Sequence, residues 1–510
     1  MKKLFLLLLP ALVSCDSVEN YSVEFAQDIA TAKHGEATHT YPIMPVEVVG
    51  ENGPRLLLPS CYLEPKHVGV VFVEGYPRSE KVAAAYQKAY GIPKENLVGV
   101  TLPIVETLSK EDFALAYEEL SAEVPDHIQV LALAWTRPFR VGNCKNPDEC
   151  MSVTSAFALG YNPERWSKNS TLLQGDLKGG KRVTLKQEAT SAYFASNSCR
   201  PFDDFSFRPA MLLPGTPEEV DILIQRGKRS ILSFPKGSVH LVTTTDPARN
   251  VRTHQFDFIE HHWRYNWNLD IENFSNLDGA PGDDEIRDSE DVLFYFTGLP
   301  YLFHTSSNKY LPGSVGEHLT SYGGVIRVDD SLKDLARLFR RRAPFHQTTV
   351  LAWLNLKSID SGVTGSFGTV VEPYALPQKF TNTAAFLAEY TSGSQLVVSM
   401  WKSVQFPGQG LFVGDPLARP WGSKAKFTEE GDLVLTTTEL DAYASHTVQR
   451  RLDHKQAWED VEEIPARRKT KKQSQVRLGE KSAVFEWTLE DADPTMTYRI
   501  IPSDTPVAER

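Results

Sequence analysis

The sequence has no long hydrophobic run and no excess of positive charge. Beyond its first dozen residues, no apolar stretch approaches the roughly 20 residues that a membrane-spanning helix needs. The formal net charge is −11, which argues against nucleic-acid binding and against broad adhesion to anionic lipid. The chain has 510 residues, more than one domain usually holds, so two or three domains are expected.

Cysteine is also scarce, because the chain has only five. Apart from Cys15 they are Cys61, Cys144, Cys150 and Cys199, an even number that permits two disulfides in an oxidising compartment, with three possible connectivities. Cys144 and Cys150 flank a short segment and could close a small loop. Zinc is the competing use, but neither the spacing nor nearby histidines support it. We therefore expect no metal site, and no motif indicates a cofactor.

The first fifteen residues, MKKLFLLLLPALVSC, have the pattern of an export signal. Lys2 and Lys3 precede a short apolar segment that cannot span a bilayer, as in a signal peptide. The closing Leu12-Val13-Ser14-Cys15 resembles the bacterial lipobox, in which the cysteine is acylated, commonly with palmitate, and becomes the new N-terminus. The resemblance implies a lipoprotein attached through Cys15, since two acyl chains suffice for stable anchoring. A plain signal peptide with an incidental cysteine is the alternative.

Export of this kind places the protein in the cell envelope, either in the periplasm or at the outer surface. Residues 16–40 are polar and lack clear periodicity, so they are expected to be a tether. The expected partners are the membrane, through the anchor, and an envelope protein or polysaccharide, with no nucleic acid. The sequence does not decide between inner and outer membrane.

Residues 41–421 alternate between strand and helix patterns. We expect strands at Val68–Val73, Leu97–Leu102 and Ile128–Ala134. Helical patterns lie between them, at Ser79–Tyr90 and Ser109–Ala122. The alternation weakens at about 144–208, which indicates an insertion, and then returns. Repeated βαβ units predict an α/β domain with a mostly parallel sheet and flanking helices.

The pattern changes again in residues 422–510. Short segments alternate apolar and polar residues there, which predicts a small all-β module of sandwich type. The basic run Arg467–Lys472 is expected to be a solvated hairpin tip, with contact to an anionic surface or polysaccharide as the alternative.

Glycine-rich motifs concentrate in the second half of the α/β region. They lie at Val292–Tyr301, Leu311–Gly324, Ser361–Tyr374 and Leu411–Trp421, and each follows or ends an apolar run. Glycine permits positive φ and close backbone approach at such strand ends. In open α/β sheets these loops meet at the edge where ligands bind.

The order of these motifs resembles an uncharacterised family of exported bacterial proteins that occurs with exosortase-type sorting systems. The family's H-x-x-S element is matched by His318 and Ser321, its EP-[YC] element by Glu372-Pro373-Tyr374, and its GDPL element by Gly414-Asp415-Pro416-Leu417. The resemblance covers roughly Val68 to Trp421 and implies no activity, because none is established for the family.

A more remote resemblance is to gingipain-type cysteine peptidases of the caspase-like fold. Their catalytic histidine and cysteine follow adjacent strands, and the thiolate attacks while the imidazole handles the proton. This chain has Phe296-Thr297-Gly298 at the first place and Leu319-Thr320-Ser321-Tyr322 at the second, and no cysteine follows Cys199. The resemblance therefore implies the fold without the cysteine dyad.

Another chemistry could use the same residues. His318 and Ser321 are three apart, so in a helical turn they would share a face, with His318 as base, Ser321 as nucleophile and Glu372 or Asp415 orienting the base. The alternative is that His318 and Ser321 only satisfy loop backbone and that Asp415 fixes a turn.

Taken together, the sequence favours a lipid-anchored envelope protein that binds or assembles, on a caspase/gingipain-like α/β fold without peptidase activity. The alternative is an envelope hydrolase acting on peptide or glycan through His318 with Ser321 or an acidic residue.

Overall fold

The computed structural model describes residues 43–49, 55–170, 173–174, 184–185, 207–264, 266, 268–280, 282–326, 348–453, 455–469 and 476–503. Cys15, Cys199, the expected tether and about half of the expected insertion lie outside these residues. Within the described ranges, none of the helices combines the length and the apolar character that crossing a membrane requires.

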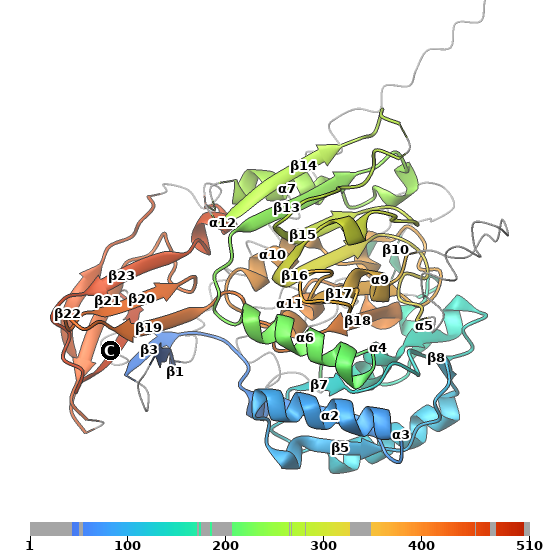
Figure 1. The fold of residues 1–510 in the computed structure, drawn as a ribbon, viewed down its shortest axis with the longest axis horizontal. Coiled ribbons are helices and arrows are strands. Elements are labelled where there is room, and N and C mark those ends of the chain that lie inside the picture. The colour runs from blue at the N-terminus through green and yellow to red at the C-terminus, as the bar shows by residue number, and fades with distance from the viewer. Residues whose placement is uncertain are drawn as a thin grey trace, which may run out of the picture.

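A ten-stranded sheet forms the centre of the α/β region (Figure 1). All neighbouring strands are parallel except β17 and β18, so two parallel half-sheets run in opposite directions. The first half-sheet, in spatial order, contains β5 (Leu97–Val100), β4 (Val68–Val73), β7 (Val130–Leu133), β12 (Ala210–Leu212) and β18 (Gly410–Gly414). The second contains β17 (Gly365–Thr369), β16 (Tyr310–His318), β15 (Val292–Thr297), β13 (Gly237–Thr243) and β14 (Leu269–Ser275).

Helices flank this sheet, which confirms the predicted α/β class with a mostly parallel sheet. The strand β15 is buried along its whole length, as expected for a strand covered on both faces. The helices are α2 (Pro77–Tyr90), α3 (Lys110–Glu123), α4 (Val153–Leu159), α5 (Pro163–Trp166), α6 (Pro217–Ser230), α7 (His254–Trp263), α9 (Val350–Leu354), α10 (Thr383–Tyr390), α11 (Leu396–Lys402) and α12 (Leu478–Lys481). Figure 1 shows α2 and α6 side by side.

The two half-sheets meet where Gly365 of β17 faces Gly414 of β18. Gly414 has a φ of 141°, and a Cβ atom there would lie 2.5 Å from the carbonyl oxygen of Thr364. Only glycine fits such a position, because an L side chain would be both strained and in contact with backbone. The glycine-rich motifs thus allow the close approach that joins the half-sheets.

The C-terminal residues form a separate β-rich module of two small sheets. The four-stranded sheet has the order β2–β19–β20–β23, and the five-stranded sheet has the order β1–β3–β24–β21–β22. Side chains from both sheets make one hydrophobic cluster, separate from the core of the α/β region. The strands are β1 (Ile43–Pro45), β2 (Glu47–Val49), β3 (Leu56–Pro59), β19 (Ser423–Phe427), β20 (Leu433–Thr437), β21 (His446–Arg451), β22 (Glu459–Ile464), β23 (Phe485–Leu489) and β24 (Thr497–Pro502).

The module also recruits strands that the sequence had placed in the α/β domain. β2 pairs parallel with β19, and β3 pairs parallel with β24, so the blue strands β1 and β3 lie among the orange and red ones in Figure 1. Leu56 and Leu58 are completely buried in the module's cluster. The division at residues 41 and 422 therefore differs from the observed packing, because the apolar faces of the early strands find their partners at the other end of the chain.

Two further features concern the cysteines and the basic run. Cys144 and Cys150 form a disulfide that spans the loop between β8 (Arg140–Gly142) and β9 (Cys150–Ser152), and Cys61 is also disulfide-bonded. β8 pairs as well with β6 (Thr107–Leu108), and β10 (Leu173–Gln174) pairs with β11 (Thr184–Leu185). In the basic run, Arg467 is half-buried: its guanidinium lies 3.9 Å from the Phe485 ring centroid and donates to the Leu440 carbonyl. Arg468 and Lys469 are exposed, as expected for solvated residues, and residues 470–472 lie outside the described part of the chain.

Candidate functional site

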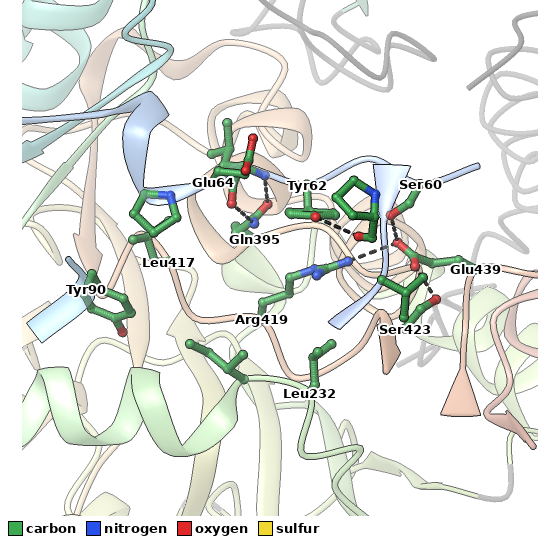
Figure 2. Close-up of a pocket in the computed structure, with 15 residues that line it drawn as sticks. Ser60, Tyr62, Glu64, Tyr90, Leu232, Gln395, Leu417, Arg419, Ser423 and Glu439 are labelled. Carbon is green, nitrogen blue, oxygen red and sulfur yellow. Dashed lines mark hydrogen bonds and ion pairs between the residues drawn. The ribbon is translucent and has the colours of Figure 1, made fainter. Parts of the chain in front are cut away.

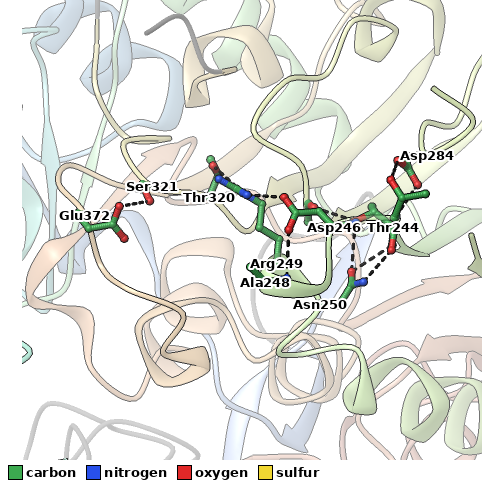
Figure 3. Close-up of polar contacts among 11 residues, drawn as sticks. Thr244, Asp246, Ala248, Arg249, Asn250, Asp284, Thr320, Ser321 and Glu372 are labelled. Carbon is green, nitrogen blue, oxygen red and sulfur yellow. Dashed lines mark hydrogen bonds and ion pairs between the residues drawn. The ribbon is translucent and has the colours of Figure 1, made fainter. Parts of the chain in front are cut away.

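The carboxyl ends of the second half-sheet gather a row of polar side chains at one edge. Parallel strands end on the same side, which is where ligands bind in open α/β sheets. Figure 3 shows this edge, with Ser321 and Glu372 on one side of Thr320 and Arg249 on the other. Ser321 follows β16 and Glu372 follows β17, so these two motif residues do come together.

His318 is the last residue of β16 and is only 1% exposed. The indole Nε1–H of Trp353 donates to its Nδ1 at 2.8 Å, and its Nε2 lies 2.8 Å from the carbonyl oxygen of Thr348. A nitrogen that accepts carries no proton, so the network places the ring hydrogen on Nε2, which donates to Thr348. Both nitrogens are therefore engaged, and neither presents a free lone pair.

Burial lowers the pKa of His318 to about 4, so the imidazole is neutral at pH 7. The strand also ends at His318, and a turn rather than a helix follows it. His318 and Ser321 thus do not share a helix face, and the geometry gives Ser321 no base. This arrangement matches the alternative in which His318 satisfies loop backbone.

Ser321 is bonded to an acid instead. Its hydroxyl donates to Glu372 Oε2 at 2.6 Å, and Glu372 Oε1 accepts from the backbone N–H of Tyr374 at 2.9 Å. Both side chains are half-buried. A carboxylate held in this way can accept hydrogen bonds from a ligand, but no described contact links it to an imidazole.

Two tyrosines beside this pair have strained backbone. Tyr322 has a φ of 57° and Tyr374 a φ of 61°, which costs a non-glycine residue of order 1 kcal/mol and is found preferentially at functional sites. Tyr322 is 38% exposed, and its burial together with the nearby Glu372 raises its pKa. The Lys168 ammonium lies 4.4 Å from the Tyr374 ring centroid and contacts its hydroxyl. We call Ser321, Tyr322, Glu372, Tyr374 and Lys168 the edge cluster.

The rest of this edge is bonded within itself. Arg249 forms an ion pair with Asp246 and donates from Nε to the Thr320 hydroxyl at 3.3 Å (Figure 3). Asp284 accepts from the backbone and hydroxyl of Thr245 and from Asn276. These contacts form a rigid frame beside the edge cluster rather than a set of groups awaiting a ligand.

Asp415 lies apart from the other predicted site residues. It follows β18, which runs opposite to β17, so it sits at the other edge of the sheet and is completely buried. Its carboxylate accepts from the Tyr86 hydroxyl at 2.8 Å, the Tyr90 hydroxyl at 2.6 Å and the backbone N–H of Leu417 at 3.0 Å. Burial raises the pKa of Asp415 to about 6. Its contacts attach α2 to the central sheet.

A pocket of about 320 Å³ lies between the α/β region and the β-rich module (Figure 2). Arg419 is its central charged group: its NH2 lies 3.0 Å from Glu439 Oε1, and its guanidinium carbon lies 4.4 Å from the Tyr62 ring centroid. Ser60 and Ser423 also donate to Glu439. The charges are thus compensated within the protein, and the contacts join the two parts of the molecule.

Sequence reasoning missed Lys168, Arg249 and the pocket. Lys168 lies more than 200 positions from Tyr374, so only the folded chain brings them together. Tyr322 and Tyr374 lie inside the glycine-rich motifs, and this was the one feature of the sequence that could have marked them as site residues.

The described residues include no group of three or more histidine, cysteine, aspartate or glutamate side chains that could hold a metal ion. The edge cluster is thus an aromatic and carboxylate surface without a catalytic base at its serine. No protein-family model, curated protein or solved structure matches the chain.

Proposed function

We propose that this protein is a lipid-anchored component of the bacterial cell envelope that binds an envelope protein or polysaccharide through the edge cluster. It acts in binding or assembly and not as a cysteine peptidase. The observation that carries the proposal is the state of His318, whose two nitrogens are engaged by Trp353 and Thr348. Without that base, Ser321 and Glu372 form a polar contact surface rather than a nucleophilic pair.

The strand order supports a caspase/gingipain-like fold as part of this proposal. Thr297 at the end of β15 pairs with His318 at the end of β16, so the two adjacent strands end side by side. In the gingipain-type arrangement the catalytic histidine and cysteine follow two such strands. Gly298 and Ser321 stand at the corresponding places here, which fits a fold that is retained without its dyad.

Exposed rings at the same edge of the sheet as the edge cluster favour a polymer as the ligand. Tyr301 and Phe303 follow β15 and are both exposed, with their ring centroids 6.4 Å apart and their planes nearly parallel. Tyr322 adds a third exposed ring at the same edge. Aromatic rings with a carboxylate and a lysine among them can contact a peptide chain or a sugar chain, because they combine apolar area with polar groups.

Photo-crosslinking in cells tests this surface. A benzophenone amino acid replaces Tyr322 in one variant and Leu115 in the control. Leu115 is an exposed residue of the helix α3, which packs against β5 of the first half-sheet. We expect a discrete adduct from position 322 and none from position 115. Protease and glycosidase treatment of the adduct then identifies a protein or a polysaccharide. Equal adducts from both positions, or none from position 322, would contradict the proposal.

The anchor is tested separately, because Cys15 lies outside the described residues. Cells fed an alkyne analogue of palmitate should label the wild-type protein and not the Cys15→Ser variant. The variant should also leave the membrane fraction, since the acyl chains supply the attachment. A wild-type protein that takes up no label would favour the plain signal peptide instead.

The contacts of His318 do not favour the hydrolase alternative. A base must reach the hydroxyl that it deprotonates, and the described contacts of His318 are with Trp353 and Thr348. We expect serine- and cysteine-directed probes to give no labelling at Ser321. Labelling of Ser321 that disappears in the His318→Ala variant would restore the alternative.

A further inference from the structure

A second histidine, on β13, has the contacts that His318 lacks. His240 pairs with Glu272 of β14, and its Nδ1 lies 2.8 Å from Glu272 Oε2. Ser238 is two residues earlier on the same strand and therefore on the same face. The His240 Nε2 lies 2.9 Å from the Ser238 hydroxyl and 3.2 Å from the Ser289 hydroxyl. A carboxylate, an imidazole and a serine thus follow one another at hydrogen-bonding distances.

The tautomer of His240 follows from these partners. A carboxylate only accepts, so the ring hydrogen belongs on Nδ1, and the lone pair of Nε2 faces the serine hydroxyls. This is the opposite assignment to that of His318. Burial lowers the pKa of His240, so the ring is neutral and able to accept a proton at pH 7. Nδ1 and Oε2 are close but not in line with the ring N–H, and the Glu272 side chain, 48% exposed, is free to turn into alignment.

Ser289 is the serine that a substrate can reach. Ser238 is buried and has another acceptor in the Asp291 carbonyl at 3.4 Å, whereas Ser289 is half-buried. The Ser289 backbone is fixed on both sides: its N–H donates to Asn308 Oδ1 at 3.0 Å, and its carbonyl accepts from the Lys309 N–H at 2.8 Å. A nucleophile held in this way keeps its hydroxyl beside the base, which serine catalysis requires.

We propose that Ser289, His240 and Glu272 form a hydrolytic site for small carboxylic esters, separate from the edge cluster. The Ser289 oxygen attacks the ester carbonyl carbon while its proton passes to His240 Nε2. The carbon–oxygen bond to the alcohol then breaks, and the alcohol leaves with that proton. Water attacks the acyl-serine, gives a proton to Nε2 and releases the carboxylic acid, and the proton returns to Ser289. Glu272 holds the ring and stabilises the imidazolium.

The charges around His240 restrict the substrate. Glu272, Asp270 and Asp291 all lie close enough to act on the ring electrostatically. An anionic ester would be repelled by these carboxylates, so the substrate is a neutral or cationic ester. Because Ser238 and His240 are buried, the acyl group approaches from the Ser289 side and must be small.

Activity profiling of the full chain, purified in detergent, tests the site. A fluorophosphonate probe should label Ser289, as located by peptide mass spectrometry, and p-nitrophenyl acetate should be hydrolysed. Ser289→Ala should abolish both, and Glu272→Gln, at an exposed position, should retain the fold and slow both. His240→Gln should lower the rate by about 100-fold or more, the usual contribution of a general base. A matched ester that carries a carboxylate should react more slowly than the acetate.

Ser121→Ala is the matched control and should react like the wild type, because the Ser121 hydroxyl lies on α3 and donates to the Tyr117 carbonyl at 2.6 Å. The photo-crosslinking result at Tyr322 is independent of this experiment, so the two proposals can fail separately. Thermal unfolding of each variant by circular dichroism identifies loss of fold. The proposal is overturned if wild-type protein is not labelled, if labelling persists in folded Ser289→Ala, or if folded Glu272→Gln and His240→Gln react at the wild-type rate.

Discussion

At the residue scale, one hydrogen-bond donor determines what a buried histidine can do. Trp353 donates to His318 and occupies its acceptor nitrogen, whereas Glu272 lies 2.8 Å from Nδ1 of His240, and Nε2 of that ring faces serine. The two rings are similarly buried, at 1% and 2% exposure. Their difference in chemistry therefore comes from their partners and not from burial.

Removing the Trp353 donor should raise the pKa of His318. The pKa of His318 is depressed from 6.5 to about 4. The neutral ring therefore contributes its full stabilisation above pH 6.5, and this stabilisation is lost as the pH falls through about 4. The shift corresponds to about 3 kcal/mol in the free energy of unfolding. In Trp353→Phe, protonated Nδ1 no longer meets another donor. We expect the pKa, followed by NMR of the imidazole, to move toward 6.5, and the folded state to lose about 1–3 kcal/mol at neutral pH.

Trp401→Phe is the control for this substitution. Trp401 is equally buried and also donates one hydrogen bond, to the Ala210 carbonyl at 3.0 Å, but the bond is made elsewhere in the core. It should cost comparable stability and leave the His318 titration in place. A His318 pKa that is the same in Trp353→Phe and wild type would refute the role given to the indole.

Asp415 should make stability depend on pH with the opposite sign. Its pKa is raised from 3.8 to about 6, so its contribution is complete below pH 3.8 and is lost as the pH rises through about 6. Asp415→Asn cannot ionise. The wild-type free energy of unfolding, minus that of the variant, should therefore fall by about 2 kcal/mol between pH 4 and pH 7. A difference that stays constant over this range, in urea unfolding, would show that the carboxyl does not titrate there.

Sequence reasoning found part of the candidate site. The motifs identified Ser321 and Glu372, which do meet, since both follow adjacent parallel strands. It could not identify Trp353, because that residue lies 35 positions from His318 and belongs to none of the motifs. Ser238, His240 and Glu272 were missed for a related reason: within single strands they read as ordinary β residues, and only pairing between β13 and β14 brings the acid to the ring.

At the element scale, the sequence predicted buried strands better than edge strands. The expected strand at Val68–Val73 is β4 without change, and the helix expected after Ser109 is α3, with the Ser109 side chain accepting from the Asp112 N–H. β22 was missed because Glu459–Ile464 carries four acidic residues and lies at the edge of its sheet. Edge strands commonly carry charge, which removes the alternating pattern that sequence reasoning uses.

The junction between the half-sheets should depend on Gly414. In Gly414→Ala, the new Cβ meets the Thr364 carbonyl and the backbone must hold a φ of 141°, so we expect a loss of roughly 2–4 kcal/mol in the free energy of unfolding. Gly91→Ala is the matched control. Gly91 also has positive φ, 66°, but nothing lies within 4 Å of an added Cβ, so its cost should be about 1 kcal/mol. Equal losses in chemical denaturation would mean that strain alone, and not the close approach, sets the cost.

At the scale of the whole molecule, the chain crosses its own domain boundary. The strands β1 to β3 precede the α/β region in sequence and yet complete the two sheets of the β-rich module. Local patterns cannot reveal this, because a short apolar segment carries no information on which distant strand it pairs with. The segment after the expected tether thus leads first into the module, and Arg419 and Glu439 then link the module to the α/β region.

The module should therefore lose stability when an early strand is weakened. Leu58 of β3 is completely buried in the module's cluster, so Leu58→Ala should destabilise the module by about 2–5 kcal/mol. Hydrogen exchange measures each part separately, and we expect faster exchange in β20 and β24 with little change in β4 and β15. Leu115 is 63% exposed, so Leu115→Ala is the control. It should change the opening free energy measured by hydrogen exchange by no more than about 0.5 kcal/mol at any amide. If Leu58→Ala instead speeds exchange in β4 and leaves β24 protected, the early strands belong energetically to the α/β region.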